Sequence, residues 1–212
     1  MSSGSSCRSR PLRRSSQATR ALAGVLWLLA AAAVLAQPPP LHYELVPEHS
    51  FVHFEVLHFG TSTSRGRFGP LQGRVVLEPA AGRGEVGIEI ATASVSTGLR
   101  VFDARLRQAD LLAADDYPLA FFVARRFVFD AAGAPREVHG EITLRGVSQP
   151  LTLRALSFAC RDEGGRPDAL CAGDFEAELL RSDFGMHFGL PFVANRVRLV
   201  VQVLARQRAP GG

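Results

Sequence analysis

The sequence predicts an all-β domain with one short amphipathic helix, arranged as an antiparallel barrel of about eight strands. Three observations indicate this fold class. Short segments alternate apolar and polar residues, turn-forming residues separate them, and a single stretch has helical periodicity. Short alternating strands at close spacing are typical of barrels and sandwiches. No internal repeat and no second domain is visible in the sequence.

Residues 1–36 have the pattern of a secretory signal peptide. Five arginines and no acidic residue precede an apolar run at 21–36, and three prolines follow it. A basic region, a short apolar region and small residues before the cleavage point are the parts of such a signal. We expect cleavage after Ala36 and export to the periplasm; an uncleaved anchor is the alternative. The expected organisation is a signal peptide at 1–36, a leader at 37–42, a barrel domain at 43–206 and a tail at 207–212.

Removing this segment changes the net charge of the chain. The 24 basic residues are all arginine, and the sequence pI is about 9.6. Five arginines precede residue 37 and all 20 acidic residues follow it, so the remaining 19 basic residues leave a net charge near −1. Nucleic-acid binding needs a basic surface. We therefore expect no nucleic-acid partner.

A two-faced strand at residues 49–59 is the most informative element. Both of its faces carry aromatic or aliphatic residues, as in a strand that lines a cavity or is covered on two sides. The face that we expect to point inward carries Phe54, Val56 and His58. The alternative inner face carries Phe51, His53 and Leu57. Gly60, the Thr/Ser cluster after it and Gly66 predict a bend or turn.

The other elements follow from the same periodicities. Strands are expected at residues 43–46, 71–78, 84–90, 119–124, 126–130, 138–144, 151–158, 174–180 and 195–205. The helical stretch covers residues 99–112, where Leu99, Phe102, Leu106 and Ala109 recur at spacings of three and four.

Cys160 and Cys171 remain once Cys7 has left with the signal peptide. Two cysteines in an exported protein suggest one disulfide, here across a polar turn between antiparallel strands. Closing so short a loop would stabilise the fold by about 3 kcal/mol. A redox-active pair is the alternative, but the CxxC spacing is absent.

Six motifs in order resemble the YceI family of lipocalin-like, polyisoprenoid-binding periplasmic proteins. In chain order they are Tyr43 with His49-Ser50; His58 with Gly66, Phe68 and Gly73; Ser94, Thr97 and Gly98 with Asp103 and Leu106; Asp110, Tyr117-Pro118 and Phe121; Gly140, Thr143 and Gly146-Val147; and Arg181 to Gly185. The similarity spans nearly all of residues 43–206. Arg105 is one departure, because relatives usually have His before the Leu.

The resemblance implies a binding protein rather than an enzyme, with no metal and no cofactor besides its ligand. The ligand would be an isoprenoid lipid, such as a quinone or a polyprenol, held inside a lipocalin-like barrel of eight strands. A transient membrane contact and a homodimer are further expectations. The residues expected to bind the lipid are Phe54, Val56, His58, Phe68, Leu106, Phe121, Phe184 and Met186. Phe51, Phe59, Phe122 and Phe188 complete the wider aromatic set that could line the barrel.

Alternatives stay open for several of these residues. The aromatic side chains could simply fill a core, as in a non-binding envelope stress protein. His58 could bond a lipid head group or a backbone carbonyl, and a metal site with His49 and His53 is disfavoured by strand parity. Asp103 and Arg181 either pair, cap backbone groups or shape a cavity mouth. An enzyme would use His58 or Asp103.

Overall fold

Ten strands and one α-helix occur in the part of the chain that the computed structural model describes, residues 38–161 and 169–208. The strands are β1 (Leu41–Leu45), β2 (Phe51–His58), β3 (Ser62–Phe68), β4 (Gln72–Glu78), β5 (Arg83–Ala91), β6 (Leu119–Phe129), β7 (Pro135–Leu144), β8 (Val147–Arg161), β9 (Leu170–Leu180) and β10 (Val193–Arg208). The helix is α2 (Arg100–Leu106), and the 3-10 helices are η1 (Pro47–His49), η2 (Pro79–Ala81), η3 (Thr92–Ser94) and η4 (Arg181–Phe184). The expected signal peptide and the last residues of the expected tail lie outside the described residues.

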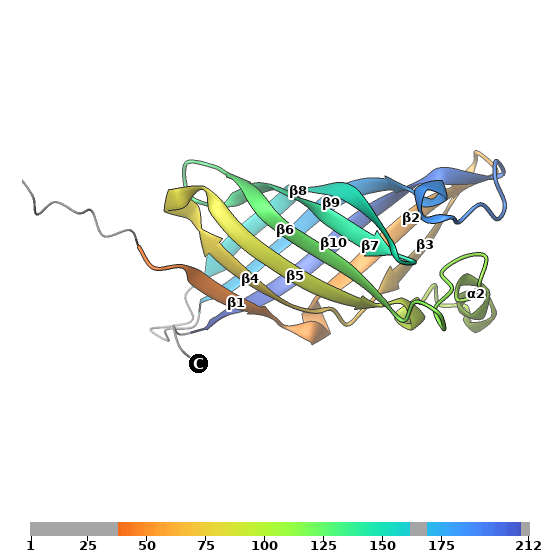
Figure 1. The fold of residues 1–212 in the computed structure, drawn as a ribbon, viewed down its shortest axis with the longest axis horizontal. Helices are drawn as coiled ribbons and strands as arrows, with labels where there is room; N and C mark the ends of the chain where they lie inside the picture. Colours follow the sequence, from red (N-terminus) through yellow and green to blue (C-terminus); the bar gives the residue numbers. More distant parts are fainter. Residues whose placement is uncertain (1–37, 162–168, 209–212) are drawn as a thin grey trace, which may run out of the picture. The chain divides into compact units, whose positions relative to one another are not determined.

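The strands close into an eight-stranded antiparallel barrel (Figure 1). Neighbours pair in the order β1, β4, β5, β6, β7, β8, β9 and β10, and β10 pairs back onto β1. The long strand β10 also pairs with β2, which pairs with β3. Thus β1 and β2 are two segments of one barrel strand, and β3 and β4 are two segments of the next. The predicted fold class is confirmed.

We name the two ends of the barrel by what each contains. At the disulfide end, Cys160 of β8 is bonded to Cys171 of β9, and β1 pairs with the last residues of β10. This bond confirms the predicted disulfide, although the connection at 162–168 lies outside the described residues. The helix end carries the β2–β3 turn, α2 and η4 (Figure 1).

Alternation places the apolar residues of each strand inside the barrel. Val86, Ile88 and Ile90 of β5 are buried, as the pattern predicts. In β2, Val52 and Phe54 are buried, and Val56 and His58 continue the inner face toward the helix end. The preferred inner face of this strand is therefore the observed one.

Two elements differ from the prediction. Residues 62–68 form strand β3 rather than a bend, since their backbone pairs with β2 over its whole length. Gly66 faces inward there, and a Cβ at this position would lie 2.4 Å from Phe54 Cζ, so only glycine leaves room for the ring. The helix ends at Leu106 instead of 112, because the chain then tightens into turns that bury residues 112–114.

Candidate functional site

The helix end of the barrel contains a cavity of about 220 Å³. Strands β2, β3, β7, β9 and β10 contribute ten of its nineteen lining residues, and the others come from α2, η4 and the segments after η3, α2 and η4. The lining is mainly apolar, with four polar side chains. It consists of Phe54, Val56, His58, Ser64, Phe68, Val95, Phe102, Arg105, Leu106, Leu111, Leu112, Leu144, Leu179, Arg181, Met186, Phe188, Val193, Val197 and Leu199.

The disulfide end is filled more completely. Its inner faces leave a space of about 70 Å³. The side chains around it are aliphatic or aromatic, together with Cys171: Tyr43, Leu45, Val75, Leu77, Val86, Ile88, Phe122, Phe127, Pro135, Val138, Leu153, Phe158, Phe175, Val201, Val203 and Ala205. Burial raises the pKa of the Tyr43 hydroxyl above its ordinary value. This end therefore resembles an ordinary hydrophobic core.

Most of the residues predicted to bind a ligand meet at the helix end. Those that line the cavity are Phe54, Val56, His58, Phe68, Leu106 and Met186. They come from β2, β3, α2 and the segment after η4, which are far apart in the sequence. Ligand binding by this set stays a prediction.

Phe121 and Phe184 do not line the cavity, which corrects their expected placement. Phe121 lies on the outer face of β6 with 37% of its surface exposed, whereas Phe122 points inward and is 3% exposed. Consecutive residues of a strand point to opposite faces, so the correct inward residue is the next one. Phe184 is the last residue of η4; it is buried in the core and does not belong to the cavity lining.

Several lining residues were not selected from the sequence. Leu199 shares the inner face of β10 with Val197, and the strand periodicity contains that signal. Phe102 belongs to the predicted helix, but 38% of its surface is exposed rather than packed. Arg105 stood out only as a departure from the family pattern, because nothing in a charged helical residue indicates that it borders a cavity.

Arg181 supports the loop that closes one side of the cavity. Its side chain is 5% exposed, and its guanidinium donates to the carbonyls of Ala194, Met186, Phe188 and Val193 at 2.7–2.9 Å. Carbonyl oxygens satisfy its N–H groups but carry no full negative charge. Burial accordingly lowers the pKa of Arg181 below its ordinary value. Among the described residues, no carboxylate lies within ion-pair distance of it.

Asp103 is buried in α2, yet it does not pair with Arg181. Its Oδ1 accepts hydrogen bonds from the Thr97 backbone N–H and hydroxyl, each at 2.6 Å. These bonds hold the pKa of the carboxyl below its ordinary value. The sequence left open whether Asp103 pairs with Arg181, and that interpretation is wrong. Both side chains instead bond to backbone groups, as the second interpretation expected.

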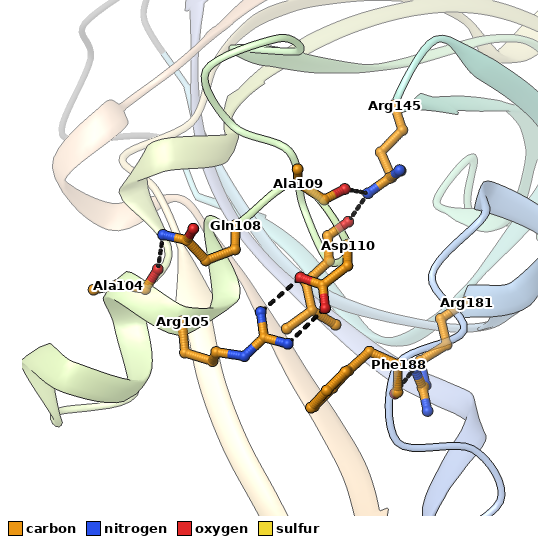
Figure 2. A network of polar contacts seen from close by, with 9 residues as sticks. Ala104, Arg105, Gln108, Ala109, Asp110, Arg145, Arg181 and Phe188 are labelled. Atoms are coloured by element: carbon orange, nitrogen blue, oxygen red, sulfur yellow. Dashed lines mark hydrogen bonds and ion pairs between the residues drawn. The ribbon is translucent and has the colours of Figure 1, made fainter.

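Arg105 connects α2 to the rim of the cavity. Its two Nη atoms bond both carboxylate oxygens of Asp110 at 2.6 Å, and its guanidinium lies over the Phe188 ring, 4.1 Å from the centroid (Figure 2). This ion pair lowers the pKa of Asp110. Arg145 donates to the carbonyls of Ala109 and Leu111 and so attaches the same loop to the end of β7.

His58 is the polar group of β2 that faces the cavity. Its ring packs edge-on against Phe59 at a centroid distance of 4.6 Å. Within residues 38–161 and 169–208, no three His, Cys, Asp or Glu side chains are grouped to hold a metal ion. No helix in those residues is long and apolar enough to cross a bilayer.

Comparisons with known proteins agree with this architecture. A family model described as the YceI-like domain matches residues 43–205. The chain is 32% identical over 163 residues to Protein YceI of Shigella flexneri, covering 74% of this chain and 81% of the relative. It is 30% identical over 161 residues to a UPF0312 protein of Pseudomonas aeruginosa, with the same coverage.

Solved structures share the fold at lower identity. BcnA of Burkholderia cenocepacia matches with a TM-score of 0.61 and 21% identity, over 76% of this chain and 98% of that one. A polyisoprenoid binding domain from Saccharophagus degradans matches with a TM-score of 0.55 and 19% identity, over 79% and 99%. The family model and the curated relatives together establish that this chain belongs to the YceI-like family.

Proposed function

We propose that this protein binds a polyisoprenoid or similar long-chain amphiphilic lipid inside the barrel and carries it in the periplasm. The observation that supports this most is the apolar cavity at the helix end, which six of the eight residues expected to bind the lipid line. Each CH₂ group that moves from water into such a cavity contributes about 0.8 kcal/mol. A hydrocarbon tail can therefore bind tightly without specific polar contacts.

The size of the cavity restricts how a long tail would fit. At about 220 Å³ it is smaller than most ligand pockets. The second space, at the disulfide end, lies in the same barrel interior. A long tail would extend toward it by displacing inner side chains such as Leu199, so a quinone or polyprenol would widen the barrel interior along its axis.

The positions and hydrogen-bond partners of Asp103 and His58, the two candidate catalytic residues, favour binding over catalysis. Asp103 does not line the cavity, and its Oδ1 is occupied by Thr97. His58 lines the cavity without an acidic residue beside it in the lining. A general acid or base normally acts together with a positioned partner.

A transient membrane contact is part of the proposal. Exposed apolar side chains surround the helix end: Leu99, Val101, Phe102, Phe188, Phe192 and Phe59. Phe59 and Phe192 are each 63% exposed with ring centroids 5.7 Å apart, and Phe59 adopts a φ of 49°, which is rare for a bulky residue. A carrier that loads from a bilayer needs its mouth at the lipid surface. A homodimer stays a prediction, which analytical ultracentrifugation would check.

Recovery of bound lipid tests the proposal directly. Protein purified from a bacterial periplasm is extracted with organic solvent, and the extract is analysed by mass spectrometry. The wild type should release an isoprenoid lipid. Val56→Trp, which fills the cavity, should release little, and Leu57→Trp, on the outer face of the same strand, should match the wild type. Empty wild-type protein that takes up neither quinone nor polyprenol would refute the proposal.

A further inference from the structure

The ionisable side chains that line the cavity are all of basic types, while the carboxylate of Asp110 lies just outside the lining and pairs with Arg105. The lining contains two arginines and one histidine, but neither Asp nor Glu. Its remaining polar residue is Ser64. A guanidinium in the wall of a hydrocarbon cavity costs desolvation energy. For Arg181, bonds to four carbonyl oxygens offset that cost without supplying a full negative charge.

Of the two arginines, Arg181 is the one whose positive charge has no carboxylate partner among the described residues, whereas Arg105 pairs with Asp110. Of the five N–H groups of the Arg181 guanidinium, four donate to carbonyl oxygens: Nε–H, both N–H groups of Nη1 and one of Nη2. One N–H of Nη2 has no acceptor among the described residues, on a side chain that lines the cavity. The formal positive charge also lacks a carboxylate within ion-pair distance in that part of the chain.

Phe188 brings the second arginine next to this group. Its carbonyl accepts from Arg181 Nη1 at 2.7 Å, and its ring lies under the guanidinium of Arg105 (Figure 2). Asp110 accepts from both Nη atoms of Arg105, whereas Arg105 Nε has no acceptor among residues 38–161 and 169–208. Arg105 thus lies at the rim with a free donor edge, and Arg181 lies deeper.

We infer that Arg105 and Arg181 form a head-group site for an oxyanion, a carboxylate or a phosphate, carried by the lipid whose tail fills the cavity. This inference rests on the proposed function and narrows its ligand class from amphiphiles in general to anionic ones. Guanidinium groups suit these heads because their planar donors match carboxylate and phosphate oxygens. In an apolar wall such a bond is screened less than in water.

Matched ligands with one tail and three heads test the inference. Farnesol, farnesoic acid and farnesyl phosphate are titrated calorimetrically into lipid-free protein. We expect the acid, the phosphate or both to bind at least about tenfold more tightly than the alcohol, as one charge-assisted hydrogen bond would give. A gain for only one of the two anions supports the inference and identifies the head.

Two variants locate the site. Arg105→Gln should reduce the ratio of anion to alcohol affinity by about threefold or more. Arg100→Gln is the control, because Arg100 is exposed on α2 and does not line the cavity. It should leave the affinity ratio unchanged. An unchanged ratio in Arg105→Gln overturns the role of Arg105.

The outcomes separate this inference from the proposed function. Equal affinity for the alcohol and both anions overturns the anionic head-group site and leaves lipid binding intact. Failure of all three ligands to bind counts against lipid binding itself and removes this inference with it.

Discussion

At the disulfide end of the barrel the inner side chains leave about 70 Å³, whereas at the helix end they leave about 220 Å³ bordered by two arginines and a histidine. Strands β9 and β10 run through both ends, so one continuous backbone serves a packed interior and a hollow one. The hollow end is supported by Arg181, Asp103 and Arg145, which bond to backbone groups of its loops. A barrel can thus keep interior space where polar side chains replace part of the packing.

Truncation of one phenylalanine at each end should reveal the largest difference. Phe122→Ala, at the packed end, should lower the free energy of unfolding by about 3–5 kcal/mol because it leaves a new cavity. Phe68→Ala, in the wall of the existing cavity, should cost about 1–2 kcal/mol because less packing is lost. Urea unfolding of lipid-free protein measures both. Equal costs would mean that the helix end is also packed solid in solution.

Removal of Arg181 tests whether polar bonds support the hollow end. Arg181→Gln leaves several buried carbonyls without donors and should destabilise the fold by about 3 kcal/mol. Arg196→Gln is the control, because it removes only an exposed pair with Glu178 and should cost less than about 1 kcal/mol. Similar urea midpoints for the two variants would contradict a supporting role for Arg181.

Opening the disulfide should affect stability without affecting the cavity. The Cys160→Ser, Cys171→Ser double variant should lose about 2–3 kcal/mol, since the bond closes a short loop at the packed end. Its uptake of lipid at saturation should equal that of the wild type, because neither cysteine lines the larger cavity. Chemical denaturation and lipid extraction provide the two readouts. A loss of lipid with unchanged stability would contradict the prediction, because it would mean that lipid binding depends on the cysteines rather than on the larger cavity.

Acidification should weaken the helix end through Asp103. Hydrogen bonds from Thr97 lower the pKa of this carboxyl in the folded state. The carboxyl therefore makes its full contribution to the free energy of unfolding above the unfolded-state pKa of about 3.9. The contribution is lost as pH falls through the lower folded value, because the unfolded state then binds more protons. Asp103→Asn should remove that part of the stability difference between pH 7 and pH 3. Asp115→Asn, in the exposed loop after α2, should retain it.

Periodicity predicted the strands well where one face is apolar and the other polar. In β5 the buried residues Val86, Ile88 and Ile90 alternate with exposed ones, and the prediction is confirmed. Strand β3 escaped detection because Ser62–Phe68 contains mostly polar residues and a glycine. Its structure depends on pairing with β2, which lies outside any local pattern.

The prediction of individual site residues was limited by parity and by irregular segments. Phe121 and Phe122 are equally apolar, so the sequence contains no signal for which of them faces inward. Arg105 and Phe188 come from a helix and from an irregular segment, and their contact has no periodicity behind it. Such a contact forms only when the folded barrel brings α2 and the segment after η4 together at the helix end.

The sequence by itself determined the all-β class, the candidate disulfide pair and the family whose motifs it contains in order. These depend on local alternation and on residue types at fixed spacing. Only the tertiary structure decided that one end of the barrel is hollow and that no carboxylate of residues 38–161 and 169–208 lies within ion-pair distance of Arg181. Cavity volume and charge compensation arise from side chains that meet from distant strands, so they are properties of packing rather than of sequence.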